Sequence, residues 1–260
     1  MLDILRARLA QKHRTFKYPK GPLPALPDRF QGRPVINGPC PDKCDICLSA
    51  CPVNAIGRRK DGGVTIDTGR CLLCGACSGA CPHKSIVFTR NHQLAAARRE
   101  DLVIAAGSQK SADAVSVMAK KYFSRSLKLR QVSAGGCNAC EADVNVLGTP
   151  AWDMGRFGIQ FVASPRHADG LLVTGPVTAN MALALQKTYE ALPEPRVVIA
   201  CGSCAISGGP FADHPEANNG AGSLLPVDLY IPGCPPHPLT ALDGLLRFLG
   251  RTAPGFGEDS

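Results

Sequence analysis

Thirteen cysteines dominate the chemistry of this chain, and eight of them fall into two short runs. In both runs the cysteines stand three or four residues apart, and the last one precedes a proline. The runs are Cys40, Cys44, Cys47, Cys51 before Pro52, and Cys71, Cys74, Cys77, Cys81 before Pro82. Thiolates at this spacing are typical ligands of [4Fe-4S] clusters, with a structural zinc site as the alternative. The runs therefore predict iron–sulfur chemistry.

The second run repeats the first at an offset of thirty residues, and the match continues beyond the prolines, where Val-Asn-Ala-Ile corresponds to His-Lys-Ser-Ile. Only Cys40 departs from the repeat, because three residues separate it from Cys44 where two separate Cys71 from Cys74. A duplicated run of this kind is typical of two-cluster bacterial ferredoxins, in which the fourth cysteine of each run binds the other cluster.

The two runs are therefore expected to exchange their last cysteines. The first set of ligands would be Cys40, Cys44, Cys47 and Cys81. The second set would be Cys71, Cys74, Cys77 and Cys51. The extra residue before Cys44 is expected to bulge out of the binding loop. In an alternative interpretation Cys40 does not bind, and a three-iron cluster remains.

Composition limits the classes of protein to consider. A chain of 260 residues with 45% hydrophobic residues has room for one or two domains with apolar cores. Cysteines at metal-binding spacings favour a reducing compartment over a disulfide scaffold. The sequence shows no export signal and no apolar stretch long enough to span a bilayer. We therefore expect a cytoplasmic protein that is peripheral on the cytoplasmic face of the inner membrane.

The formal charge of +8 is unevenly distributed along the chain. Residues 1–35 contain eight Lys/Arg and two acidic residues, whereas residues 134–260 contain six and twelve. A basic arm can bind nucleic acid or a membrane surface. The interpretation we favour is that the arm docks on a partner subunit, with no nucleic-acid partner. Clusters ligated by four thiolates would also offset part of the positive charge.

The order of elements predicts four segments. Residues 1–34 are expected to form an extended basic arm with a short helix marked by Leu2, Leu5 and Leu9. Residues 35–92 form a 2x[4Fe-4S] ferredoxin domain, residues 93–126 a helical connector, and residues 127–260 a second domain. In that domain short β-rich runs alternate with helices, one of which Thr178 could cap and another of which begins at Pro238 and is closed by Gly250.

This alternation indicates a parallel sheet covered on both faces. The expected fold class is α/β, with an N-terminal dicluster ferredoxin-like α+β module followed by a flavodoxin-like doubly wound parallel sheet. Ligands of such sheets bind beyond the carboxyl ends of the strands.

The remaining cysteines follow expected strands of this sheet. A third set of ligands, Cys137, Cys140, Cys204 and Cys234, would meet at the strand ends and bind a third cubane. One cysteine is left over. We assign Cys201 as the spare thiol, because it ends a buried strand where small apolar thiols are common.

Five motifs carry a resemblance to a known family. They are Gly-Gly-Cys137-Asn-Ala-Cys140-Glu141, Arg156-Phe-Gly-Ile, Ser164-Pro-Arg-His-Ala-Asp169, Leu-Val-Thr-Gly-Pro-Val-Thr178 and Val-Asp-Leu-Tyr-Ile-Pro-Gly-Cys-Pro-Pro236. Residues 120–250 resemble the small subunit of membrane-bound [NiFe] hydrogenases of the formate-hydrogenlyase type, which is related to the 20 kDa cluster-bearing subunit of complex I. The N-terminal half, with Arg29-Phe-Gln-Gly-Arg-Pro, resembles the dicluster ferredoxin subunit of those complexes. The chain thus looks like a fusion of two neighbouring subunits. Complex I has adjacent cysteines in the first motif, so the spacing of Cys137 and Cys140 favours the hydrogenase branch.

The resemblance implies an oxidoreductase subunit that transfers electrons and has no catalytic residue of its own. Three [4Fe-4S] clusters would connect a soluble electron donor, such as formate dehydrogenase or ferredoxin, with a large [NiFe]-hydrogenase-like catalytic subunit. Membrane arm subunits of the same complex would be further partners. The alternatives are a complex I-like NADH/ferredoxin-quinone oxidoreductase subunit and an iron–sulfur sensor or scaffold.

Three residues in the family motifs are candidates for contact with the third cluster. Glu141 could relay protons or tune the cluster, or it could be an ordinary carboxylate at a helix start. Arg166 and His167 lie in a motif assigned to the interface with the large subunit. His167 could donate to a cluster sulfur, touch a quinone-like pocket or be merely structural. His83 and His237 adjoin ligand cysteines, where hydrogen-bond donors alter the reduction potential.

Overall fold

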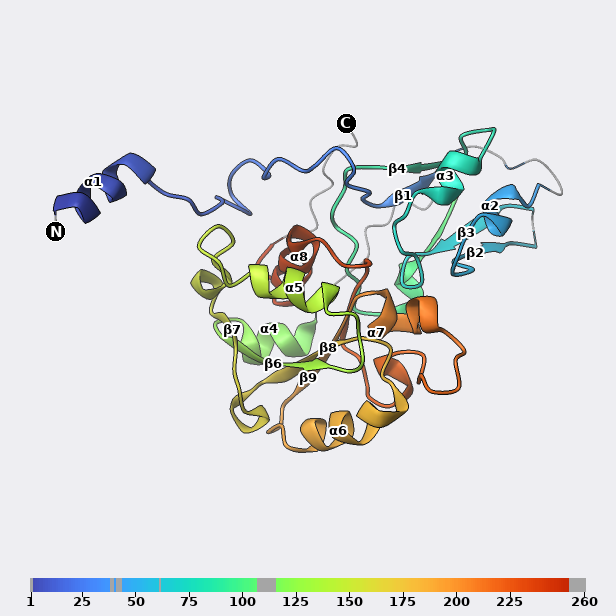
Figure 1. Cartoon of the computed structure of the whole chain (residues 1–260). Helices are drawn as coiled ribbons and strands as arrows, with labels where there is room; N and C mark the ends of the chain where they lie inside the picture. Colours follow the sequence, from blue (N-terminus) through green and yellow to red (C-terminus); the bar gives the residue numbers. More distant parts are fainter. Residues whose placement is uncertain (1, 38–39, 41–43, 61, 107–115, 253–260) are drawn as a thin grey trace.

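The computed structural model describes residues 2–37, 40, 44–60, 62–106 and 116–252. A larger region is built on a parallel sheet, and a smaller region that carries the two cysteine runs lies beside it (Figure 1). Among the described residues, no helix has the length and apolar character needed to cross a membrane.

The larger region contains a five-stranded sheet in which every neighbouring pair is parallel. Its strands are β6 (Leu127–Ser133), β7 (Ile159–Phe161), β8 (Gly170–Thr174), β9 (Val197–Cys201) and β10 (Leu229–Ile231). The spatial order is β10-β9-β8-β6-β7. Counted in chain order this is the flavodoxin-like arrangement, with the switch point between β6 and β8. The predicted fold class is confirmed.

Helices cover both faces of this sheet (Figure 1). One face packs against α4 (Val117–Phe123), α5 (Ala139–Val146) and α8 (Pro238–Phe248), and the other against α6 (Ala179–Glu190) and α7 (Ser203–Ser207). The alternation of side chains along a strand accounts for the two cores. Along β8, for example, Leu172 enters the first core while Leu171 and Val173 enter the second.

Local sequence signals explain the helix ends. α8 begins at Pro238, whose missing N–H is not needed in the first turn, and Gly250 with φ 66° lies just beyond its end. The His237 side chain caps this helix by accepting a hydrogen bond from the Leu239 N–H at 3.1 Å. Thr178 occupies the N-cap position of α6 as predicted, although its side chain makes no capping hydrogen bond.

The smaller region is a compact α+β unit. A two-stranded antiparallel sheet pairs β1 (Pro34–Ile36) with β4 (Ile86–Phe88), and a three-stranded antiparallel sheet has the order β2-β3-β5. The strands of the latter are β2 (Ile56–Arg58), β3 (Val64–Asp67) and β5 (Val103–Ala105). The short helices α2 (Ile46–Ser49) and α3 (Ala76–Ala80) carry Cys47 and Cys77 into the core, against Ile36, Ile56, Val64, Ile66 and Ile86.

The helical connector predicted for residues 93–126 is wrong over its first part. Residues 99–102 form the 3-10 helix η1 (Arg99–Leu102), and β5 follows and pairs with β3. Only α4 is helical as predicted, and residues 107–115 lie outside the described part of the chain. The physical reason is that an edge strand of the smaller region offers pairing for the β-branched stretch after Leu102. The boundaries of the four predicted segments stay a prediction.

Four further 3-10 turns complete the larger region. They are η2 (Met154–Phe157), η3 (Pro165–His167), η4 (Gly209–Phe211) and η5 (Ala221–Ser223). The first of them helps to hold the arm, because Arg156 donates to the Tyr18 carbonyl at 2.8 Å.

The N-terminal arm starts with α1 (Leu2–Gln11), which the leucine spacing predicts and which extends away from the rest of the protein (Figure 1). None of its residues is buried. The following segment is anchored, because the Phe16 and Trp152 rings meet edge-to-face at 5.1 Å and Tyr18 is buried.

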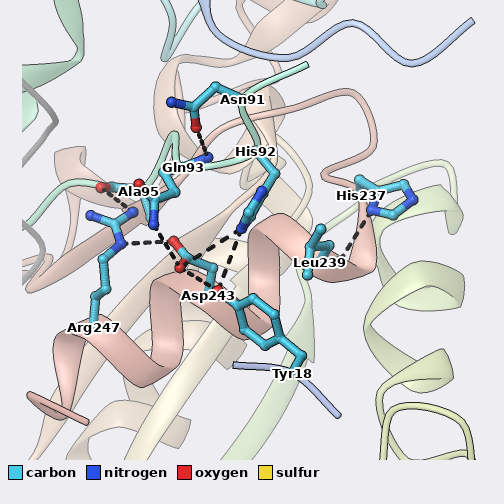
Figure 2. Close-up of polar contacts among 9 residues, drawn as sticks. All are labelled: Tyr18, Asn91, His92, Gln93, Ala95, His237, Leu239, Asp243 and Arg247. Atoms are coloured by element: carbon cyan, nitrogen blue, oxygen red, sulfur yellow. Dashed lines mark hydrogen bonds and ion pairs between the residues drawn. The ribbon is translucent and has the colours of Figure 1, made fainter. Parts of the chain in front are cut away.

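A buried polar network ties this arm to both regions (Figure 2). Its centre is Asp243 on α8, which accepts from the Tyr18 hydroxyl at 2.6 Å and from Arg247 Nε at 2.7 Å. Gln93 donates to the same carboxylate at 3.4 Å, and His92 Nε2 lies 3.9 Å from it. Burial lowers the pKa of His92, and burial followed by the Asp243 charge raises that of Tyr18. Several partners thus compensate a buried carboxylate that would be costly alone.

Candidate metal centres

The second set of cysteines lines a single cavity of the smaller region. Cys51, Cys71, Cys74 and Cys77 all face it, although Cys51 comes from the other run. The remaining walls of the cavity are apolar, formed by Pro52, Val53, Ala55, Ile56, Ile66, Leu72, Gly75, Ala76 and Phe88. Four thiols around an apolar cavity are the donor set and the surroundings that a [4Fe-4S] cluster requires.

The thiols of the second set need a cation to become thiolates. Burial first, and then the neighbouring cysteines, raise the pKa of Cys71 to about 12 and that of Cys77 to about 11. Only a backbone hydrogen bond opposes this at Cys71, whose Sγ accepts from the Leu73 N–H at 3.3 Å. A metal that displaces these protons would remove the repulsion, so its binding would release protons and stabilise the fold.

The cysteines of the first set are also close enough to raise one another's pKa. Burial and then Cys44 raise the pKa of Cys40, and Cys81 contributes in the same direction. Burial, Cys40 and Cys81 likewise raise the pKa of Cys47. The predicted bulge before Cys44 falls on residues 41–43, outside the described residues.

The thirty-residue repeat extends to the backbone around the exchanged cysteines. Asn54 and Lys84 both adopt φ 50°, a conformation that few side chains accept. Next to them, the Ala55 N–H donates to Cys51 Sγ at 3.2 Å and the Ser85 N–H donates to Cys81 Sγ at 3.4 Å. Burial raises the pKa of Cys81, but hydrogen bonds from the backbone of Ser85 and His83 outweigh it, so that pKa is lowered.

The third set gathers at the carboxyl edge of the parallel sheet. Cys137 and Cys140 follow β6, Cys204 lies in α7 after β9, and Cys234 follows β10. Burial, followed by Cys204, Glu141, Cys234 and Cys137, raises the pKa of Cys140 to about 12. Burial, followed by Cys234 and Cys137, raises the pKa of Cys204 to about 11. The four thiols thus lie together although 96 residues separate Cys137 from Cys234.

Glycine backbones make room for this set. Gly202 has φ 93°, and a Cβ there would lie 2.5 Å from Cys140 Sγ. A Cβ at Gly209 would lie 2.9 Å from Cys204 Sγ. Both positions therefore leave a cradle around the thiols that any larger side chain would fill.

Cys201 is the last residue of β9 and lies inside the apolar core, beside this edge. It is 0% exposed and packs with residues of α5, α8 and the sheet. Burial raises its pKa well above the ordinary thiol value. The assignment of Cys201 as the spare thiol stays a prediction.

Among the described His, Cys, Asp and Glu residues, no group of three or more could hold a single metal ion. A cubane makes a different demand, because each thiolate binds a different iron and the four ligands stand further apart. The apolar cavity of the second set and the glycine cradle of the third set leave room for such a group.

Glu141 is a buried carboxylate beside the third set. It lies in the first turn of α5, and its Oε1 accepts from the Thr174 hydroxyl at 2.6 Å. Burial raises its pKa, but hydrogen bonds from Ser133 and Thr174 outweigh burial and the pKa is lowered. The charge of Glu141 in turn raises the pKa of Cys140. A negative charge is thereby fixed next to one of the candidate ligands.

Comparison with protein families matches two separate parts of the chain. Residues 40–85 match the model described as 4Fe-4S dicluster domain, which covers both cysteine runs. Residues 137–248 match the model of the NADH ubiquinone oxidoreductase 20 kDa subunit, which covers the third set. A probable membrane-bound hydrogenase subunit of Pyrococcus furiosus is 41% identical over 51% of this chain and 80% of its own length. The chain belongs to the family of the 20 kDa subunit.

Other members of this family come from two kinds of complex. A subunit of the NADH-quinone oxidoreductase of Heliobacterium modesticaldum is 45% identical over 45% of this chain and 68% of its own length. Formate hydrogenlyase subunit 7 of Escherichia coli is 43% identical over 50% of this chain and 51% of its own length. The chain is thus an iron–sulfur subunit of the type found in hydrogenase and complex I-like oxidoreductases, with a dicluster domain joined to the family domain.

Arg166 and His167 are not brought together with the third set by any described contact. Both are exposed in η3, which leads into the start of β8, whereas the cysteine loops follow the carboxyl ends of their strands. Their role toward the cofactor stays a prediction. His237 caps α8 through Nδ1, and its pKa is lowered by burial. His83 contributes to the first set through its backbone rather than its ring.

Two contacts around the sets were not expected from the sequence. Arg58 donates to the Cys44 carbonyl and pairs with Asp45 at 2.8 Å, which brings a positive charge to the first set. The sequence contains a signal for this contact, because Arg58 breaks the repeat. The position thirty residues later is the uncharged Phe88. Ser203 donates to the Cys71 carbonyl at 2.8 Å, and no spacing pattern marks it.

Proposed function

We propose that this chain is an electron-transfer subunit that holds three [4Fe-4S] clusters on the three sets of cysteines. The observation that supports this proposal most directly is the third set. Its thiols come from three segments that follow β6, β9 and β10, and they are close enough at one edge of the sheet to raise one another's pKa. Together with the two sets of the dicluster domain, the third set uses twelve of the thirteen cysteines and leaves Cys201 in the core.

The bound clusters would supply one-electron transfer. The chain would provide their surroundings: apolar walls around the second set, backbone N–H groups aimed at Cys51, Cys71 and Cys81, and a carboxylate beside the third set. Burial, hydrogen bonds to sulfur and nearby charge are the means by which a protein adjusts cluster potentials.

The proposed partner at the third set is a large [NiFe]-hydrogenase-like catalytic subunit. Cys137 and Cys234 are exposed at the edge of the sheet, where an electron can leave only toward a second redox centre close by. A soluble donor such as formate dehydrogenase or ferredoxin would supply electrons to the dicluster domain. Membrane arm subunits would hold the complex on the cytoplasmic face of the inner membrane. The hydrogenase relatives support this assembly.

A complex I-like quinone reductase is the second candidate, which the 20 kDa subunit model and the Heliobacterium relative favour. In that case the large partner would lack nickel and would deliver electrons to quinone. The dicluster domain and the third set would act in the same way in both complexes.

Purification from the native membrane fraction tests this proposal. We expect the chain to co-purify with a larger subunit, and metal analysis of the complex to show nickel together with iron. A complex that contains the larger protein and lacks nickel would favour the quinone reductase. A stable monodisperse monomer without any large partner would contradict the proposed function in both forms and favour a sensor or scaffold.

A further inference from the structure

A small contact joins the dicluster domain to the parallel sheet. The Ser203 hydroxyl donates to the Cys71 carbonyl at 2.8 Å and lies 3.1 Å from the Gly233 carbonyl. Ser203 is 1% exposed, so water does not compete for these bonds. The backbone N–H of Ser203 already donates to Gly233 at 2.8 Å. The Gly233 carbonyl thus has a second donor, so loss of the hydroxyl would affect the Cys71 carbonyl more.

The position of this hydroxyl relative to the candidate ligands is unusual. Cys71 belongs to the second set, whereas Ser203 directly precedes Cys204 and Gly233 directly precedes Cys234 in the third set. One side chain thus connects the backbone of a second-set cysteine with two loops of the third set.

The surroundings hold this contact in place. Ser207, one turn further along α7, donates to the Gly69 carbonyl at 3.2 Å. Gly69 packs so closely that an added Cβ would lie 2.8 Å from Ile206 Cγ2 and 2.9 Å from Leu102 Cδ1. Asp67 and Arg99 form a bidentate ion pair with distances of 2.8 and 2.6 Å. Loop 67–71 is thus fixed against α7 by hydrogen bonds, packing and charge.

We propose that Ser203 is a positioning residue for electron transfer between the second and the third set. It would fix the separation of the two clusters and provide the hydrogen-bonded link between their ligand loops. This inference rests on the proposed three-cluster function. In the step it serves, one electron passes from the reduced cluster on the second set to the oxidised cluster on the third. No bond is made or broken and no proton is transferred.

The Ser203→Ala variant of the full chain tests this role. A one-electron reductant of the dithionite type is mixed in substoichiometric amount with the oxidised holoprotein, and rapid-freeze EPR follows the appearance of each cluster signal. We expect iron content and all three cluster signals to remain. The electron should reach the third cluster several-fold more slowly than in the wild type, and the magnetic coupling between the two reduced clusters should change.

Ser207→Ala is the matched comparison, because it removes a hydroxyl from the same helix whose acceptors, the Gly69 carbonyl at 3.2 Å and the Ser203 carbonyl at 3.1 Å, do not belong to candidate ligands. It should loosen loop 67–71 without removing the bond to Cys71, and so should change the rate and the magnetic coupling less than Ser203→Ala does. Gly69→Ala is an independent second variant. It keeps every hydroxyl but should push loop 67–71 away from α7, and so should weaken the coupling and slow the transfer.

The outcomes separate this inference from the proposed function. Absence of a third cluster from the wild-type chain would overturn the proposed function itself. Three intact clusters with wild-type transfer and coupling in both Ser203→Ala and Gly69→Ala would overturn the role of Ser203 alone. An equal slowing by Ser207→Ala would also overturn it, because a general loosening of α7 would then explain the effect. If Ser203→Ala does not fold, Gly69→Ala decides by the same two measurements.

Discussion

The second set in the dicluster domain and the third set at the sheet edge each consist of four thiols, but the chain brings the two sets together by different routes. In the dicluster domain, Cys71, Cys74 and Cys77 lie within seven residues, and a single exchanged cysteine completes the set. At the sheet edge, Cys137, Cys204 and Cys234 come from three loops that only the order of the strands brings together. The first arrangement is therefore largely local, whereas the second depends on the whole domain.

This difference has consequences for how each region responds to damage. A local loop can keep three ligands when distant packing is disturbed, since its short segment sets their spacing. The sheet edge loses its geometry whenever β6, β9 or β10 moves relative to the others. The dicluster domain should accordingly tolerate mutations elsewhere in the chain better than the third set does.

The largest expected effect comes from the sheet edge. Cys204→Ser should remove the third cluster, with about four fewer irons per chain and loss of its EPR signal. Cys201→Ser is the matched control three residues away, and it should keep all the iron because Cys201 is buried in the apolar core. Equal loss in both variants would show that Cys201 was wrongly assigned as the spare.

The exchange of cysteines in the dicluster domain is tested next. Cys51→Ser should damage the cluster on Cys71, Cys74 and Cys77, although Cys51 belongs to the other run. Cys81→Ser should damage the cluster of the first set. EPR of the two variants, compared with variants of Cys44 and Cys74, shows which signal each one loses. If Cys51→Ser and Cys44→Ser lose the same signal, the exchange does not occur.

The network between the two regions should matter for stability rather than for iron binding. Arg247→Met leaves the buried Asp243 without its closest charge partner, and such a loss typically costs about 3–5 kcal/mol. Thermal unfolding of the holoprotein, followed by circular dichroism, measures the change. Lys187→Met is the control, because it breaks an exposed pair with Glu190 that contributes little. Similar midpoints for the two variants would contradict a structural role for the network.

A smaller, pH-dependent effect is expected at Glu141. Its pKa is lowered in the folded state, so its contribution to stability is present above the ordinary pKa of glutamate, about 4.3, and is lost as the pH falls through the folded pKa. Thr174→Val removes a donor at 2.6 Å and should destabilise the fold by about 1–3 kcal/mol near neutral pH. Because cluster sulfide is acid-labile, unfolding midpoints of wild type and variant are compared from pH 7 to pH 5, where Glu141 stays ionised and the difference between them should be constant. A difference that shrinks within this range would contradict this account.

Much of the fold was predictable because its signals are local. The runs that form β8 and β9 are largely apolar, as strands buried on both faces must be. The two ends of α8 are marked in the same local way, because Pro238 favours a first helical turn and Gly250 favours the turn that follows a helix. Signals of this kind do not depend on distant segments, so the sequence alone reveals them.

The rest depends on contacts between distant segments. Residues 103–105 carry β-branched residues that fit a helix or a strand, and the choice is made by the free edge of β3. The Asp243 network could not be foreseen either, because its members come from the arm, the end of the dicluster domain and α8.

The candidate sites divide in the same way. Spacing alone predicts the candidate ligands of the dicluster domain, because the repeat sets which cysteines correspond. The partners of the third set are less visible in the sequence. Thr174 reaches Glu141, and Ser203 reaches Cys71, across 33 and 132 residues. Single hydroxyls of this kind have no sequence pattern, so only the folded chain reveals them.

The most direct test of the three-cluster account is the metal content of the full chain. Anaerobic reconstitution followed by iron and acid-labile sulfide analysis should give about twelve of each per chain, from three cubanes on twelve cysteines. About eleven irons with a three-iron EPR signal would indicate that Cys40 does not bind. Eight or fewer irons in fully loaded, folded protein would remove the third cluster and contradict the account.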